Sequence, residues 1–194
     1  MSLSWADLNA QILACERCSL AKGIRNKVPG QGNLQARLML IGEGPGAEED
    51  LQGLAFVGAA GQLLTRMLAA INLAREDVFI ANTVKCRPPG NRVPLPGETA
   101  ACLPFLREQV RQIRPQVILL LGATALKTVL GLDKRITACR GQWVESKGVF
   151  LTSTYHPAAL LRDPGKKKDA WADLQAVRER LAALKTSVYP VDGI

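Results

Sequence analysis

Arg37-Leu-Met-Leu-Ile41, followed at once by Gly42-Glu-Gly-Pro-Gly46, is the stretch that decides the fold of this 194-residue chain. The first part is a compact apolar run, typical of a buried strand, and the glycines and proline after it predict a tight turn. Apolar runs of the same kind recur over residues 78–80, 115–121 and 148–154. Helical periodicity is found between and after them, over residues 58–71, 98–114, 123–130 and 169–184.

Short apolar strands that alternate with helices are typical of a parallel sheet covered on both faces. We therefore predict an α/β fold with a central, four-stranded, mainly parallel sheet flanked by helices on both faces. The length suits a single domain over residues 1–194, with 185–194 as a frayed tail. Smaller expectations are a helix over 5–14, a hairpin arm over 136–144, and a kink or late start at Pro104.

The charge balance favours a polyanionic partner. The formal net charge is +8, and lysine and arginine side chains release the counterions that condense on phosphates. A soluble protein with a merely basic surface is the alternative. No apolar run approaches the roughly 18 residues that span a membrane, and the first helical segment carries polar residues, which excludes a secretory signal there. We expect a cytoplasmic, monomeric protein without a membrane partner.

Four of the five cysteines suggest a metal centre. Cys15 and Cys18 are spaced C-x2-C, and Cys86 and Cys102 form a second pair. In a reducing compartment such a set favours metal ligation over disulfides, with four buried thiols as the alternative. Four thiolates serve a structural zinc or a [4Fe–4S] cluster equally well, and the spacing does not separate the two. Cys139 has no partner and is interpreted as a spare thiol.

Unusual loops follow three of the predicted strands: residues 42–46, 82–89 and 155–157. In open α/β sheets ligands bind beyond the carboxyl ends of the strands, so these loops are expected to form one site. The glycine turn nominally fits the dinucleotide fingerprint. However, Pro45 lacks an amide hydrogen, and the acids at 48–50 would repel a pyrophosphate. A neutral ring suits the turn better.

Three side chains near these loops suit a nucleobase. Phe56 can stack on a ring, and the amide of Asn82 offers one acceptor and one donor to a pyrimidine edge. His156 is the only histidine of the chain and lies on the last of the loops. A lone histidine is often structural, but its coincidence with the other two loops favours a role in the reaction.

Several motifs then occur in register. They are Gly42-Glu-Gly-Pro-Gly46, Phe56-Val57-Gly58, Asn82 with Val84-Lys-Cys-Arg-Pro-Pro89, and His156-Pro-Ala-Ala-Leu-Leu-Arg162. Together with the cysteine pattern, they resemble the family 4 uracil-DNA glycosylases, the iron–sulfur branch of that superfamily, over residues 15–162. The resemblance implies an enzyme that flips uracil out of single- or double-stranded DNA and hydrolyses its bond to the sugar, leaving an abasic site.

The resemblance also implies roles for individual residues. It favours a [4Fe–4S] cluster over zinc, on Cys15, Cys18, Cys86 and Cys102. It implies that Phe56 stacks on the uracil, that Asn82 reads its O4 and N3–H edge, and that His156 faces O2. The remaining contacts would come from the glycine turn to the base, at Gly42, Glu43 and Gly44, and from Leu160 or its neighbour Leu161 and Arg162 to the DNA. The lysines that follow could also contact phosphates: Lys166, Lys167 and Lys168.

The residue that activates water is less clearly marked. Other branches carry an aspartate in the glycine turn, where this chain has Gly44. We expect Glu43 to act locally and Glu49 to hold the water, although an acidic cluster that starts a helix is the plain alternative. A module that binds uracil or damaged DNA without cleaving it, built around a four-cysteine metal centre, is the competing function. A sister branch that traps DNA through an extra histidine loop is excluded, because His156 has no companion.

Overall fold

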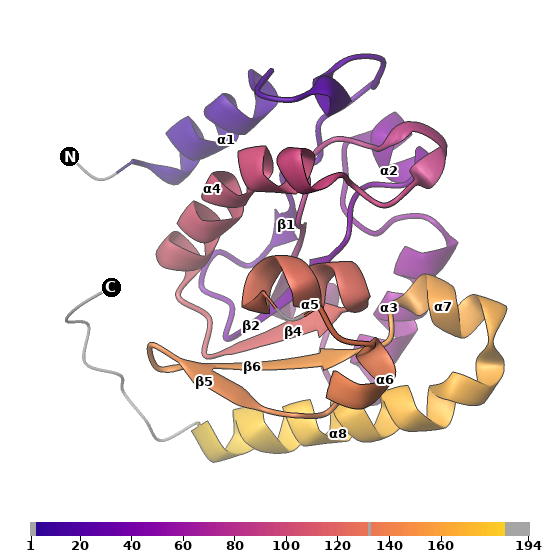
Figure 1. Cartoon of the computed structure of the whole chain (residues 1–194). Coiled ribbons are helices and arrows are strands. Elements are labelled where there is room, and N and C mark those ends of the chain that lie inside the picture. The colour runs from indigo at the N-terminus through magenta and orange to yellow at the C-terminus, as the bar shows by residue number, and fades with distance from the viewer. Residues whose placement is uncertain (1–2, 132, 185–194) are drawn as a thin grey trace.

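A six-stranded sheet forms the centre of the computed structural model, which describes residues 3–131 and 133–184 (Figure 1). The strand order is β1-β3-β2-β4-β6-β5. The four inner strands run parallel, and each edge strand pairs antiparallel with its neighbour. The strands are β1 (Gln31–Gly32), β2 (Leu38–Gly42), β3 (Val78–Asn82), β4 (Val117–Leu121), β5 (Val144–Ser146) and β6 (Val149–Thr154).

Helices cover both faces of this sheet. In chain order they are α1 (Trp5–Leu13), α2 (Ala47–Gln52), α3 (Ala59–Ala70), α4 (Pro96–Ile113), α5 (Ala123–Leu130), α6 (Ile136–Cys139), α7 (Pro157–Arg162) and α8 (Lys167–Ala183). Short 3-10 turns lie between them at Ser19–Ala21, Arg75–Asp77, Pro89–Asn91 and Pro164–Lys166.

Alternation along the inner strands produces two separate cores. In β2, Leu38 and Leu40 pack with α3 and α8, whereas Met39 and Ile41 pack on the opposite face with α4 and α5. Successive side chains of a strand point to opposite faces, so a strand that is apolar throughout needs cover on both sides. Every residue of β2, β3 and β4 is buried, which explains their continuous apolar runs.

The predicted fold class is confirmed, and the differences lie at the edges. The sheet gains β1, too short to leave a sequence pattern, and β5, which pairs with β6 in a hairpin. Residues 136–144 were expected to form a hairpin arm, but they begin with α6 and only their last residue enters β5. Helix α4 starts at Pro96 and continues through Pro104. The frayed tail expected at 185–194 lies outside the described residues.

The sheet register brings the three loops together. Gly42 at the end of β2 is paired with Asn82 at the end of β3, and Leu121 at the end of β4 is paired with Thr154 at the end of β6. The parallel strands therefore end at one edge of the sheet, where α2, α7 and the start of α5 meet (Figure 1). No helix in the described part of the chain is long and apolar enough to cross a membrane.

Candidate active site

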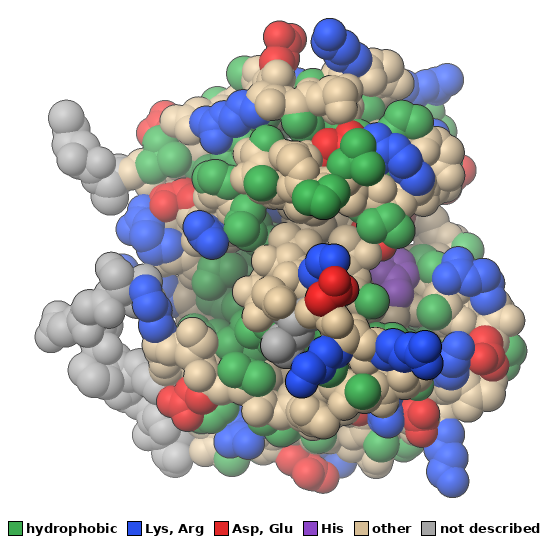
Figure 2. Space-filling view, in the orientation of Figure 1, with side chains coloured by type: hydrophobic (Ala, Val, Ile, Leu, Met, Phe, Trp, Pro, Cys, Tyr) green, Lys and Arg blue, Asp and Glu red, His purple; other side chains and the backbone are tan. Residues whose placement is uncertain are grey.

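A cleft of about 650 Å³ opens at the carboxyl ends of the strands. Its walls come from all three loops and from the starts of α2, α3, α5 and α7, and the ring of the only histidine is visible in a recess of this face (Figure 2). The lining includes Glu43, Gly44, Glu49, Phe56, Asn82, Thr124, His156 and Arg162. Seven of these eight residues were expected at the site from the sequence, and Thr124 was not.

Phe56, Asn82 and His156 all line this cleft, and the first two lie against Gly42. A Cβ atom at Gly42 would lie 2.5 Å from Oδ1 of Asn82 and 2.6 Å from Cζ of Phe56, so any larger residue would displace both side chains. The rings of Phe56 and His156 have centroids 5.6 Å apart and planes tilted by 32°. The glycine is therefore needed for the close approach of the two groups that were expected to hold a base.

The Asn82 side chain is buried, and its carbonyl oxygen lacks a hydrogen-bond donor among the described residues. The residue is 1% exposed, and its Oδ1 atom has no hydrogen-bond partner among the described residues. A buried acceptor without a donor costs about 1–3 kcal/mol, and such groups persist mainly where a ligand or function requires them. Asn82 is thus preorganised to accept a hydrogen bond from a bound molecule.

Phe56 is held in a backbone conformation that phenylalanine rarely adopts, with φ of 53°. Two side chains fix this turn. Arg75 donates from its guanidinium to the carbonyls of Ala55, at 2.8 Å, and Phe56, at 3.1 Å. Glu49 accepts from the amides of Val57 and Gly58. Strain of this kind persists only where the surroundings over-determine it, and here it presents the Phe56 ring to the cleft.

His156 is a neutral imidazole with a defined tautomer. Its Nδ1 atom accepts a hydrogen bond of 3.1 Å from the amide of Ala158, so the ring proton is on Nε2. Burial lowers the pKa of His156 to about 4, and the positive charge of Arg162 adds to the effect. At neutral pH the ring is therefore an uncharged N–H donor that lines the cleft.

This pKa predicts an unusual pH profile. A histidine whose pKa is lowered on folding stays neutral above its folded value and gains its proton only as the pH falls through about 4. A reaction rate that depends on the neutral His156 donor is expected to stay level from pH 8 to pH 5 and to change only near pH 4. Single-turnover rates across this range test the expectation, and a titration near pH 6.5, the value of an exposed imidazole, would contradict it.

The two glutamates in the cleft differ in their bonding. Oε2 of Glu43 accepts from the hydroxyl of Thr124, and this is the only protein donor to its carboxylate in the described part of the chain. Glu49 is 9% exposed and accepts from three backbone amides, those of Gly46, Val57 and Gly58. Glu49 thus joins the glycine turn to the Phe56 turn. From the sequence it was expected to hold a water, and these contacts were not predicted.

The four cysteines of the expected metal centre line one small cavity, although they come from distant parts of the chain. Cys15 and Cys18 follow α1, Cys86 follows β3, and Cys102 lies in α4. All four are free thiols, and the walls between them are largely apolar, with Leu20, Val84 and Phe105. Burial raises the pKa of Cys86 to about 12, and the neighbouring Cys102 adds to it. Cys139 is buried elsewhere, in the core beneath α5.

Four thiols that line one cavity are a donor set typical of a metal centre. Among residues 3–131 and 133–184 there is no group of three or more His, Cys, Asp or Glu side chains that could hold a single metal ion. A zinc ion needs its four sulfurs at about 2.3 Å from one point. A cluster of several atoms needs them farther apart around a common centre. Four thiols around one cavity supply the number of ligands that either group takes.

Comparison with known proteins agrees with the site. The profile of the uracil DNA glycosylase superfamily matches residues 29–175, a stretch that contains all three loops. The chain belongs to this superfamily. It is 42% identical over 181 residues to a type-4 uracil-DNA glycosylase of Archaeoglobus fulgidus, covering 89% of this chain and 91% of that protein. It is 47% identical to that of Thermotoga maritima over 160 residues, 80% of this chain and 82% of the relative.

A type-5 uracil-DNA glycosylase of Pyrobaculum aerophilum is more distant, with 34% identity over 156 residues, 72% of this chain and 69% of the relative. The resemblance to the type-4 branch that the motifs indicated is confirmed.

In this member of the superfamily, the residues expected to contact DNA divide into buried and exposed ones. Leu160 or its neighbour Leu161 was expected to enter DNA, and Leu160 is 2% exposed and packs in the core with α3, which leaves its neighbour as the candidate. The adjacent Leu161 is 43% exposed. Arg162 lines the cleft. Successive residues of a helix point about 100° apart, so α7 can bury one leucine and expose the next.

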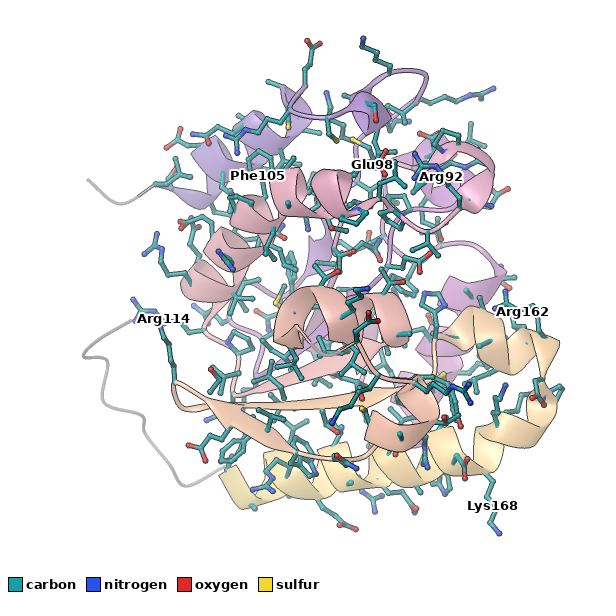
Figure 3. All side chains as sticks on the ribbon, viewed as in Figure 1. Arg92, Glu98, Phe105, Arg114, Arg162 and Lys168 are labelled. Carbon is teal, nitrogen blue, oxygen red and sulfur yellow. The ribbon has the colours of Figure 1, made fainter. Side chains whose placement is uncertain are left out.

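The three lysines also differ. Lys166 forms an ion pair of 3.0 Å with Asp163, whereas Lys167 and Lys168 are exposed at the start of α8. Figure 3 shows Arg162 on α7 and Lys168 projecting away from the molecule on α8.

One ion pair at the cleft was not foreseen from the sequence. Arg92 lines the cleft and donates two hydrogen bonds of 2.8 Å to Glu98, which is 4% exposed (Figure 3). The Arg92 guanidinium, with the amide of Leu95 and the hydroxyl of Ser19, lowers the pKa of Glu98 to about 2. The acid three residues after Leu95 was the available sequence signal, because this spacing is typical of a helix start.

Proposed function

We propose that the protein excises uracil from DNA: it binds the flipped base in the cleft and hydrolyses the bond between uracil and the sugar. The observation that carries the proposal is the buried, unpaired Oδ1 of Asn82 beside the Phe56 ring. The N3–H group of uracil supplies the donor that Oδ1 lacks, and the amide nitrogen of Asn82 can donate to O4. The type-4 relatives support the same reaction, an N-glycosidic hydrolysis that serves DNA repair.

The same amide explains selectivity against cytosine. Cytosine carries a donor at position 4 and an acceptor at N3. A fixed Asn82 would therefore place its donor nitrogen against the donor of cytosine and its acceptor oxygen against the acceptor. One buried group left unpaired costs about 1–3 kcal/mol, which is enough to favour uracil. Phe56 can stack on uracil and on cytosine alike, so it adds affinity but no selectivity between them.

His156 is placed to stabilise the leaving base. Cleavage of the bond leaves negative charge on uracil, and the Nε2–H of a neutral imidazole can donate to the oxygen that gains it. A preorganised donor in a site from which water is excluded contributes roughly 2.7–4 kcal/mol. The hydrogen bond from the amide of Ala158 to Nδ1 keeps the proton of the neutral ring on Nε2, the atom that donates to the base.

We assign the attacking water to Glu43 rather than Glu49. The carboxylate of Glu43 lines the cleft and has one protein donor among the described residues, Thr124, so it can still accept from a water. Three backbone amides already occupy Glu49. Glu49 is a positioning residue that holds the two turns together around the base. The glycine turn packs closely against Val84, because a Cβ atom at Gly44 would lie 2.9 Å from Cγ2 of that valine.

Substitution separates the two glutamates. Glu43→Gln is expected to slow single-turnover cleavage by about 100-fold, the lower end of the contribution of a general base, with little change in KM or Tm. Glu49→Ala leaves three amides without their acceptor, so the free energy of unfolding is expected to fall by about 3 kcal/mol and KM to rise. Thermal melting and kinetics on a uracil oligonucleotide provide the readouts, and the reverse pattern would return the water to Glu49.

We propose a [4Fe–4S] cluster on Cys15, Cys18, Cys86 and Cys102, which line one apolar cavity. When bound, the cluster would join α1, the loop after β3 and α4 into one unit, a structural role that needs no redox step. Iron in this form absorbs near 400 nm and zinc does not, so the absorption spectrum of the purified protein distinguishes them.

The DNA is proposed to cross the cleft toward α8. Leu161 would enter the gap left by the flipped base, and Arg162, Lys167 and Lys168 would contact phosphates. The exposure of Leu161 and the charges at this side support the placement. Binding of single- as well as double-stranded DNA, by a monomer located in the cytoplasm, remains part of the proposal.

The lysines give a salt-dependent test. Each phosphate contact adds about 0.9 to the slope of log affinity against log salt on duplex DNA, so Lys167→Ala with Lys168→Ala should reduce the slope by up to about 1.8. Lys166→Ala is expected to change it less, because Asp163 already pairs with this lysine. Lys22→Ala, at an exposed site on another part of the chain, is the control. An unchanged slope in the double variant would show that these lysines do not bind DNA.

The proposed activity is tested by incubating the protein with a uracil-containing oligonucleotide and cleaving abasic sites with alkali. Strand scission at uracil, and not at thymine or cytosine in the same position, is expected. Tight binding to the uracil strand without scission would establish the competing function of a non-cleaving module. His156→Ala serves as the control that keeps the fold while removing the donor.

A further inference from the structure

A buried lysine lies between the base pocket and the cysteine cavity. Lys85 is 2% exposed, and its Nζ atom donates to the backbone carbonyl of Asn82 at 3.0 Å and to Oε1 of Gln109 at 2.7 Å. Gln109 is itself fully buried and donates to the carbonyl of Pro29. The lysine therefore fixes the backbone at the end of β3, at Asn82, whose side chain is proposed to face the base.

The charge of Lys85 has no acidic partner within hydrogen-bonding range. Among the ion pairs of the described residues none includes Lys85, and both of its acceptors are neutral carbonyl groups. Lysine is almost never fully buried unless it is paired, because a buried ammonium loses the solvation of water. A negative charge close to the ammonium would offset this loss.

The cysteine cavity can supply that charge. Lys85 lines the same cavity as Cys15, Cys18, Cys86 and Cys102. Four thiolates with a divalent ion, or with a cluster of equal charge, remain net negative, so a loaded centre would balance the buried ammonium. Electrostatic attraction is strong in a buried, apolar environment, and this holds for zinc and for iron alike.

We propose that Lys85 is a positioning residue that couples the two sites: the loaded cysteine centre fixes its ammonium, and the ammonium fixes the carbonyl of Asn82. The inference rests on the proposed function, since Asn82 is taken to read uracil. It gives the metal centre a local part in base recognition, in addition to any effect on stability. The coupling acts through one side chain and two hydrogen bonds, and it needs no movement of the strands.

The test is a double-mutant cycle in the metal-loaded protein. Lys85→Met keeps most of the side-chain volume and removes the ammonium. It is expected to slow single-turnover uracil cleavage by roughly 10-fold in the native background, the size of one lost hydrogen bond, and by less than about 2-fold in the Asn82→Ala background. Affinity for a duplex with an abasic-site analogue, which lacks the base, should change by less than about 2-fold. Equal slowing in both backgrounds would overturn the proposal.

A second readout does not depend on cleavage. A chelator should remove the metal from Lys85→Met several-fold faster than from the native protein. The loss of the thiolate-to-metal absorption measures the rate of release. Lys127→Met, at an exposed lysine of α5, is the matched control and should release metal at the native rate. Release from Lys85→Met at the native rate would overturn the charge-balancing part of the proposal, and with it the coupling.

A third variant covers the possibility that Lys85→Met does not fold. Gln109→Met removes one acceptor of the ammonium and leaves the lysine in place, so the same pattern is expected at smaller size, and additivity with Asn82→Ala would overturn the proposal. If the native protein does not cleave uracil, the proposed function fails. Binding to an uncleavable uracil analogue and metal release would then still decide whether Lys85 joins the two sites.

Discussion

Asn82→Ala is expected to slow uracil cleavage by about 100- to 1000-fold, the range observed when one preorganised donor is removed from a buried site. The substitution removes both hydrogen bonds that Asn82 is proposed to make to the base edge. Because Oδ1 of Asn82 is unpaired in the described structure, its loss should not destabilise the fold, and the Tm is expected to stay the same or rise slightly. Single-turnover rates and thermal melting measure the two effects separately.

The isosteric variant sharpens this prediction. Asn82→Asp has the same shape but only acceptors, so it opposes O4 of uracil and can accept from the amino group of cytosine. The ratio of uracil to cytosine cleavage is therefore expected to fall, beyond the general loss of rate. Asn9→Ala on α1, away from the cleft, is the control for a loss of an asparagine side chain. A variant Asn82→Ala with native rate would show that the base is read elsewhere.

Cys86→Ser is expected to have the largest effect on stability. Structural metal sites with cysteine ligands contribute on the order of 10 kcal/mol to folding, and one kcal/mol corresponds to about 2–4 °C at this chain length, so loss of half that amount would lower the Tm by about 10–20 °C. The variant should also lose its metal, measured by iron and zinc content. The physical reason is that a metal bound by the four sulfurs would join segments that are far apart in the chain.

Cys139 provides a matched control for this experiment. It is also a buried cysteine, 7% exposed, but it packs in the core with α5 and does not line the cysteine cavity. Cys139→Ser makes the same chemical change, a thiol to a hydroxyl, and should lower the Tm by only a few degrees with native metal content. Equal effects of the two substitutions would mean that Cys86 is an ordinary core residue.

The rest of the chain illustrates which features depend on long-range packing. The acids at 48–50 mark a helix start in the sequence, but only the fold shows that Glu49 reaches the amides of Val57 and Gly58. Arg92 lies in a loop and Glu98 lies six residues later in the first turn of α4, and no periodic pattern predicts their contact. The edge strand β1 has two residues, fewer than any pattern of alternation needs.

The sequence by itself determined the α/β fold, the inner strands and the three loops beyond them, because continuous apolar runs, glycine turns and motif spacing are local properties of the chain. The tertiary structure decided which of two neighbouring side chains is buried and which is exposed. Leu160 and Leu161 are chemically identical, and only the position of α3 buries the first and exposes the second. Lys85 also looks like an ordinary surface cation in the sequence. Its burial between Asn82 and the cysteines follows from the docking of α4 against the end of β3, a contact that no local pattern contains.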